Sequence, residues 1–335
     1  MRTPTAPEIA LTESLLRLAA WLQSRGYAFT TVTPATQARV NARPGSAKAR
    51  GLRDVFGWSR PFPATLLPPE AMDCLHAGRL LQDAGGGLLR SAVRFSTLEG
   101  QLFAHSAYPT TAEDAVFFGP DTVRFVALIA DELRRQPLAP GGVVLDLGCG
   151  AGPGGIMAAR AAAAQQPRLV LSDINAKALR FAAANAAHAG WSMARLAQGD
   201  LYGAVEGAFD LIVSNPPYLN DSKQRAYRHG GGRFGEALSV RIVREGLPRL
   251  APGGRLVLYT GVAMVDGEDP LLQGLRGNLD ERGWPWSYRE LDPDVFGEEL
   301  DQPAYEEAER IAAVALVVQC PPAAEPTTQL SPARS

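Results

Sequence analysis

Cysteine and histidine are scarce in this chain of 335 residues, and both shortages narrow the classes of protein to which it can belong. The three cysteines, Cys74, Cys149 and Cys320, show no C-x-x-C spacing, which argues against a disulfide framework and favours reduced thiols in a cytoplasm. The four histidines show no H-E-x-x-H spacing, so we expect no metal site. No apolar run approaches the roughly 20 residues of a membrane span, and the N-terminus lacks the apolar core of a signal peptide. We therefore expect a cytoplasmic protein without a membrane segment.

A large excess of charge is also missing, since the formal net charge is −2. The balance hides an asymmetry, because residues 1–60 hold nine basic side chains against three acidic ones, whereas residues 290–309 are strongly acidic. A basic N-terminal part is compatible with an anionic partner such as RNA. A solvated, arginine-rich surface is the other interpretation, and the modest overall charge favours it.

Strand and helix patterns alternate through the C-terminal two thirds of the chain. Apolar runs predict strands over 143–147, 168–172, 194–198, 209–214, 254–260, 286–291 and 311–319. Helical spacing of apolar residues predicts helices over 153–165, 175–189, 236–250 and 270–282. Such alternation is typical of an α/β fold, a doubly wound sheet with helices on both faces.

The N-terminal part has a different pattern. We expect helices over 9–25 and 69–82, an irregular or hairpin segment over 34–62, and strands over 88–96 and 101–106. Helices followed by a hairpin predict a small α+β, winged-helix-like domain. The proposed division is an accessory or substrate-recognition domain at 1–116, a catalytic domain at 117–320 and a disordered tail at 321–335, where proline and small residues dominate.

A glycine-rich loop follows the first predicted strand of the large domain. Gly148, Gly150 and Gly152 allow the backbone to turn sharply and to approach a ligand closely. The third glycine of a dinucleotide-binding G-x-G-x-x-G loop is replaced by Pro153, and Asp146 precedes the loop by two residues. The spacing is therefore G-x-G-x-G, which argues against a dinucleotide-binding loop.

The next strand ends in a second acidic residue, Asp173. A carboxylate at that position can accept hydrogen bonds from both ribose hydroxyls, and Ile174 after it could lie on an adenine ring. Asn175 is expected to cap the following helix instead of binding a ligand.

The tetrapeptide Asn215-Pro216-Pro217-Tyr218 follows a strand in the same way. The two prolines hold the chain extended, which directs the side-chain oxygen of Asn215 and the carbonyl of Pro216 to one point. Two converging acceptors can bind an NH₂ group and orient its nitrogen lone pair toward a bound reaction partner. Tyr218 could stack on a planar amide or base. We expect these four residues to form the reaction centre.

Together these motifs resemble S-adenosylmethionine-dependent class I methyltransferases, and in particular the N5-glutamine methyltransferases that modify peptide-chain release factors. The resemblance covers about 117–319 and includes the segments 118–122, 230–235 and 251–256. It implies a seven-stranded sheet with a terminal hairpin and S-adenosylmethionine as cofactor. It also implies that Thr122 lies near the cofactor, that Asp146 supports the methionine part, and that Asp200 and Leu201 meet the adenine amino group and ring.

The sequence departs from that family in ways that leave the acceptor open. Leu258-Tyr259-Thr260-Gly261 stands where the family commonly has glutamate, residues 1–116 do not resemble the family's docking domain, and the acidic C-terminal segment is longer. The preferred acceptor is a protein glutamine, as in a release factor. An RNA base (adenine N6 or guanine N2), a small metabolite, and a cofactor-binding protein without transfer activity are the alternatives.

Overall fold

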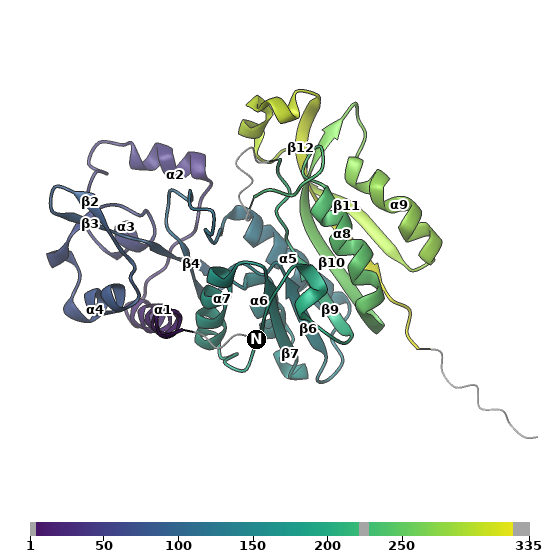
Figure 1. The fold of residues 1–335 in the computed structure, drawn as a ribbon, viewed down its shortest axis with the longest axis horizontal. Helices are drawn as coiled ribbons and strands as arrows, with labels where there is room; N and C mark the ends of the chain where they lie inside the picture. The colour runs from purple at the N-terminus through teal and green to yellow at the C-terminus, as the bar shows by residue number, and fades with distance from the viewer. Residues whose placement is uncertain (1–4, 221–227, 324–335) are drawn as a thin grey trace, which may run out of the picture.

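A seven-stranded sheet forms the centre of the larger lobe in the computed structural model, which describes residues 5–220 and 228–323 (Figure 1). The strand order in these residues is β11-β12-β10-β9-β6-β7-β8. Neighbours from β10 to β8 run parallel, whereas β12 is antiparallel to both β10 and β11. The strands are β6 (Val143–Leu147), β7 (Arg168–Asp173), β8 (Arg195–Gln198), β9 (Phe209–Ser214), β10 (Leu250–Val265), β11 (Trp286–Asp292) and β12 (Ala308–Gln319).

Helices cover both faces of this sheet, which confirms the predicted doubly wound α/β architecture. One face carries α5 (Pro120–Arg135), α6 (Pro153–Ala161) and α7 (Ala176–His188), and the other carries α8 (Ala237–Gly246) and α9 (Pro270–Arg282). Alternate strand residues reach opposite layers: Leu211 and Val213 of β9 join the first apolar cluster, and Ile212 joins the second. Because both faces are buried, the strands read as continuous apolar runs, as parallel strands usually do.

The N-terminal part is a smaller α+β lobe with a three-stranded sheet of order β1-β3-β2 and a separate two-stranded pair. The hairpin expected to end at residue 106 is formed by β4 and β5, and a second hairpin that was not expected, β2–β3, directly follows α4. A short 3₁₀ helix, η1 (Ala64–Leu66), connects β1 to α4. The elements are α1 (Ala6–Ser24), α2 (Pro34–Asn41), α3 (Leu52–Phe56), β1 (Phe62–Pro63), α4 (Pro69–Ala77), β2 (Leu81–Gly85), β3 (Leu88–Ser91), β4 (Val93–Leu98) and β5 (Gln101–Ser106).

Three expectations for this lobe were wrong in detail. The helix expected over 69–82 ends at Ala77, since Gly78 caps it and Arg79 takes a left-handed φ of 53°. Residues 81–85 are instead the first strand of a hairpin, and the glycines at 85–87 form its turn. The strand expected over 88–96 is interrupted at Ala92 and contributes to two sheets. The segment 34–62, expected to be irregular or a hairpin, contains the helices α2 and α3.

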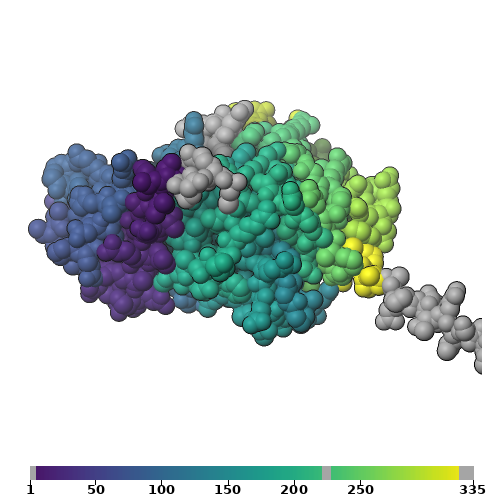
Figure 2. All heavy atoms as spheres, turned by 60° about the horizontal axis from the view of Figure 1, so that its bottom comes forward, coloured from purple at the N-terminus to yellow at the C-terminus, as the bar shows by residue number. Residues whose placement is uncertain are grey.

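The two lobes share a core along α7. Phe181 of α7 belongs to the same apolar cluster as Leu15 and Leu18 of α1, and Figure 2 shows α1, in purple, lying against the larger lobe. The buried Asn185 side chain accepts a hydrogen bond from the Ala104 amide at 2.8 Å and donates to the Ala151 carbonyl at 2.8 Å. This side chain therefore ties β5 to the glycine-rich loop.

Two further observations bear on the sequence-based expectations. Among residues 5–220 and 228–323, no helix combines the length and apolar character needed to cross a bilayer, and no group of histidine, cysteine and acidic side chains could hold a metal ion. Most of the tail expected to be disordered, from residue 324 onward, lies outside the described residues.

Candidate active site

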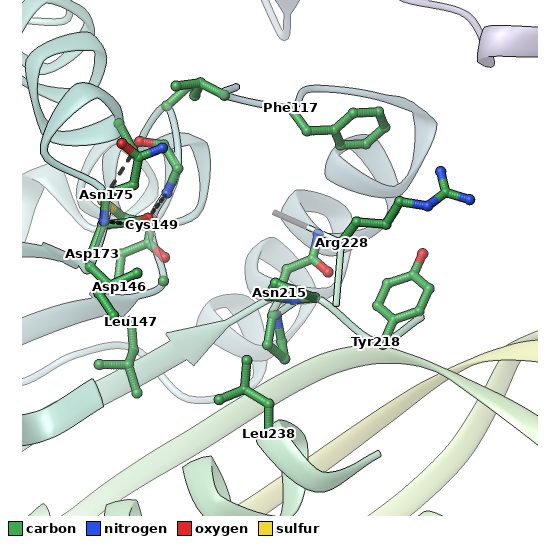
Figure 3. Close-up of a pocket in the computed structure, with 18 of the residues that line it drawn as sticks. Phe117, Asp146, Leu147, Cys149, Asp173, Asn175, Asn215, Tyr218, Arg228 and Leu238 are labelled. Carbon is green, nitrogen blue, oxygen red and sulfur yellow. Dashed lines mark hydrogen bonds between the residues drawn. The ribbon is translucent and has the colours of Figure 1, made fainter. Parts of the chain in front are cut away.

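A cavity of about 380 Å³ opens at the carboxyl ends of β6, β7 and β9, within the usual size range of ligand pockets. Open parallel sheets bind ligands at this edge, where the strand order changes direction. All but one of the predicted site residues line the cavity: Thr122, Asp146, Gly148, Gly150, Asp173, Ile174, Asp200, Leu201, Asn215, Pro216, Pro217 and Tyr218. The exception is Gly152. Figure 3 shows Asp146, Asp173 and Cys149 on one side of the cavity and Asn215, Tyr218 and Arg228 on the other.

Gly152 has a packing role in place of the expected ligand contact. It is the N-cap of α6 with a left-handed φ of 82°, and a Cβ there would lie 3.0 Å from Cδ1 of Ile156. The residue therefore lets α6 begin close to the sheet. Gly148 and Gly150, with φ values of 68° and 53°, form the part of the loop that faces the cavity.

Two buried carboxylates brace the loop from behind. Asp146 Oδ2 accepts a hydrogen bond from the Gly155 amide at 2.7 Å, and Asp173 Oδ2 accepts one from the Gly150 amide at 2.8 Å. Burial raises the pKa of Asp146 to about 7, although the Gly155 bond opposes the rise, and burial also raises the pKa of Asp173. Both carboxylates keep acceptor capacity after these bonds, since each oxygen can accept more than one.

The far end of this side carries the residues expected to meet an adenine ring. Ile174 lines the cavity and is 60% exposed, so its side chain is accessible to a ligand there. Leu201 has a left-handed φ of 44°, a strained conformation for a residue other than glycine. Asp200 accepts a hydrogen bond from Arg241 at 3.1 Å, and Asn175 caps α7 as predicted.

The Asn215 side chain is the most informative group on the other side. Its Oδ1 atom is buried and has no hydrogen-bond partner among the described residues. A buried acceptor without a donor costs about 1–3 kcal/mol, so native proteins rarely leave one unpaired. Asn215 itself lines the cavity, which makes this oxygen the candidate acceptor on the second side.

Tyr218 lies beside it in a tightly packed setting. Its hydroxyl donates to Asp121 Oδ2 at 2.8 Å, and its ring meets that of Phe296 edge-on with 5.8 Å between centroids. Tyr259 donates to Asp121 Oδ1 at 2.9 Å. Burial raises the pKa of Tyr218 well above its usual value, so the phenol keeps its proton.

Several residues of this end were not identified from the sequence. Asp121 was expected only as part of the family-like segment 118–122, Tyr259 only as part of a departure from the family, and Phe296 only as part of the acidic C-terminal segment. Phe296 has a left-handed φ of 56°, which no local pattern predicts. The sole available signal was the Gly-Pro-Asp-Thr segment, which places Asp121 next to Thr122 at the cavity wall.

Residues from distant parts of the chain also line the cavity. Among them are Pro34 of α2, Phe117 and Arg228, and Arg228 forms an ion pair with Glu299 of η5 (Gly297–Asp301). The smaller lobe, through Pro34, and the acidic segment, through Phe296, therefore both contribute to the cavity wall.

Comparison with known proteins agrees with this architecture. Residues 118–264 match the methyltransferase small domain, and together with the strand order they define a class I methyltransferase fold. The chain is similar to release factor glutamine methyltransferases.

The enzyme of Deinococcus radiodurans is 32% identical over 187 residues, which cover 54% of this chain and 63% of the relative. That of Xylella fastidiosa is 37% identical, covering 40% of this chain and 52% of the relative.

Other relatives have a different name. Ribosomal RNA small subunit methyltransferase C of Chromohalobacter salexigens is 38% identical over 116 residues, covering 34% of this chain and 30% of the relative. Among solved structures, Trm5b from Pyrococcus abyssi is 16% identical with a TM-score of 0.47, covering 71% of this chain and 62% of its own. The chain thus spans less than two thirds of the length of each of these proteins.

Proposed function

We propose that the protein is an S-adenosylmethionine-dependent N-methyltransferase whose acceptor is a planar amide nitrogen, a glutamine side chain of a protein such as a release factor. The observation that carries the proposal is the buried, unpartnered Oδ1 of Asn215 in the same cavity as the glycine-rich loop. A cofactor site and an amine-binding oxygen then share one enclosed space.

The residues of the first side fit the cofactor. Gly148 and Gly150 would lie against its methionine part with Asp146 and Thr122 nearby, and Asp173 has acceptor capacity for the ribose hydroxyls. Ile174 and Leu201 offer apolar cover for the adenine ring, and Asp200 an acceptor for its amino group. When bound, S-adenosylmethionine supplies an electrophilic methyl group on a sulfonium.

The residues of the second side fit an NH₂ group. Asn215 Oδ1 and the Pro216 carbonyl can each accept one of its two N–H bonds, which turns the nitrogen lone pair toward the first side of the cavity. The same two oxygens stabilise the positive charge that develops on nitrogen during transfer. Tyr218, whose ring is fixed by packing, can contact the planar acceptor on one face.

Charge near the cavity favours a protein acceptor over RNA. The acidic segment reaches the cavity wall through Phe296, and its exposed carboxylates repel a polyanion: Asp294, Glu298, Asp301, Glu306 and Glu307. Arg228, a cation of the wall, is paired with Glu299.

An RNA base remains the second candidate because α2 leads away from the cavity into a basic surface. Pro34, the first residue of α2, lines the cavity, and the exposed Arg39, Arg43 and Lys48 follow it along the chain. An RNA acceptor held there would bind with an affinity that falls steeply with salt. Among the described residues that line the cavity, none specifically favours a small-metabolite acceptor.

The test is Asn215→Ala, assayed with purified release factor and small-subunit ribosomal RNA of the same organism as parallel acceptors. We expect the rate of methyl transfer to fall roughly 10²- to 10³-fold, since one charge-stabilising oxygen is lost. Calorimetric affinity for S-adenosylmethionine should stay within about twofold, because the glycine-rich loop is untouched.

Asn278→Ala, on α9 in the opposite helix layer, is the matched control and should transfer methyl normally. An unchanged rate in Asn215→Ala would remove Asn215 from the reaction. Transfer to RNA alone would replace the protein acceptor by the second candidate.

A further inference from the structure

Asp121, at the second position of α5, is buried beneath the acceptor side of the cavity among hydrogen-bond donors. Its Oδ2 accepts from Tyr218 at 2.8 Å, and its Oδ1 accepts from Tyr259 at 2.9 Å and from Arg124 at 3.3 Å. Burial raises the pKa of its carboxyl, and the two tyrosines and Arg124 oppose the rise. Arg124 also bonds Asp292 at 2.7 Å, which ties the start of the acidic segment to the same network.

Two kinds of contact fix the ring of Tyr218: packing against its neighbours and the hydrogen bond from its hydroxyl to Asp121. A Cβ at Gly261 would lie 2.4 Å from Cδ2 of Tyr218, so the ring rests directly on the backbone of β10. Phe296 packs against it at an interplanar angle of 68°. The hydroxyl is the only polar atom of the ring, and its bond to Asp121 therefore fixes where the ring points within this slot.

Tyr259 is the second tyrosine whose hydroxyl donates to Asp121. Burial and the Asp121 carboxylate raise the pKa of Tyr259, so its phenol keeps the proton that it donates. The two tyrosines thus give each oxygen of Asp121 a phenol donor.

We propose that Asp121 and Tyr259 are positioning residues that hold the ring of Tyr218 in the orientation in which it contacts the methyl acceptor. The effect of these residues on methyl transfer rests on the proposed function, whereas the hydrogen bonds around Asp121 do not depend on it. Neither residue needs to touch the acceptor, since Asp121 acts through the Tyr218 hydroxyl and Tyr259 acts through Asp121.

A double-mutant cycle separates this role from direct contact, using release factor as the acceptor probe. Asp121→Asn should lower kcat/KM for the acceptor about 10- to 100-fold, the range for one hydrogen bond to a charged group. Affinity for S-adenosylmethionine should change by less than about twofold. In a Tyr218→Phe background, which lacks the hydroxyl, Asp121→Asn should add at most about a twofold loss. Equal losses in both backgrounds would overturn the proposal, because Asp121 would then act without Tyr218.

Tyr259→Phe and Tyr288→Phe form a matched pair. Both variants remove a tyrosine hydroxyl that donates to an aspartate. Tyr288 donates to Asp269 at 2.6 Å, and neither Tyr288 nor Asp269 lines the cavity. Tyr259→Phe should lower acceptor kcat/KM, and Tyr288→Phe should leave it unchanged. Equal effects would mean that loss of any buried tyrosine hydroxyl, not the network, explains the result.

If the wild-type protein transfers methyl to neither acceptor, NMR can still test whether Asp121 holds the Tyr218 hydroxyl. In protein labelled with [ζ-¹³C]tyrosine, Asp121→Asn should shift the Tyr218 resonance, whereas Tyr288→Phe should not. A missing shift overturns the positioning role. A shift in a protein without transfer activity sustains the network and contradicts only the proposed function.

Discussion

Gly261 in β10 gives the sharpest prediction, because a single added methyl group meets the reaction centre. In Gly261→Ala the new Cβ would lie 2.4 Å from Cδ2 and Cε2 of Tyr218, whereas carbon atoms normally approach to about 3.5–4.0 Å. The ring must therefore move by about 1 Å. A displacement of that size lengthens its 2.8 Å bond to Asp121 beyond hydrogen-bonding distance.

Two costs add up in this variant. Overpacking in a well-packed region costs about 1–3 kcal/mol, and the loss of a hydrogen bond to a charged group costs about 1.5–3 kcal/mol. We expect the free energy of unfolding to fall by about 3 kcal/mol or more, measured by urea denaturation. Methyl transfer should fall with it, while cofactor affinity is retained.

Gly277→Ala is the matched control. This glycine lies in α9 with no atom near its added Cβ, so alanine should stabilise the helix by about 0.5–1 kcal/mol. If Gly261→Ala were as stable as the wild type and equally active, the packing of Tyr218 described above would be wrong.

Two further predictions concern buried polar groups. Burial raises the pKa of Asp146 to about 7, so between about pH 4 and 7 this carboxyl is protonated in the folded protein and ionised in the unfolded chain. The free energy of unfolding therefore decreases as the pH rises from 4 to 7. In the wild type this decrease in the free energy of unfolding should be about 4 kcal/mol, and in Asp146→Asn it should be absent when denaturation is measured at each pH. An unchanged pH profile in the variant would contradict the raised pKa. Asn185→Leu strands the amide and carbonyl of Ala104 and the carbonyl of Ala151, and should cost about 3 kcal/mol or more. Faster hydrogen exchange across β4 and β5 would show the lobes loosening, and unchanged exchange would mean that Asn185 does not join them.

Local pattern predicted much of the larger lobe. The strands 143–147 and 209–214 and the helix 270–282 begin and end where expected, because a buried parallel strand is a continuous apolar run and Asp269 and Gly283 bound the helix. The smaller lobe was harder, since Leu80 and Leu81 fit a helical face as well as a strand. The glycines that follow turn a hairpin there instead of ending a helix.

The candidate site likewise contains residues that the sequence pattern predicted and residues that it did not. Residues at the carboxyl ends of strands, such as Asp173 and Asn215, could be found because the fold brings all such positions to one edge of the sheet. The network around Asp121 could not, because Tyr218 and Tyr259 lie 97 and 138 residues away in sequence. No periodicity links such positions, and only the folded chain brings them into contact.

The most direct test of the account is to incubate the purified protein with methyl-labelled S-adenosylmethionine and a lysate of its own organism, then divide the product between protease and ribonuclease. We expect label that protease alone releases, and none when Asn215→Ala replaces the wild type. Label released only by ribonuclease would contradict the protein acceptor, and no label in any fraction would contradict methyl transfer itself.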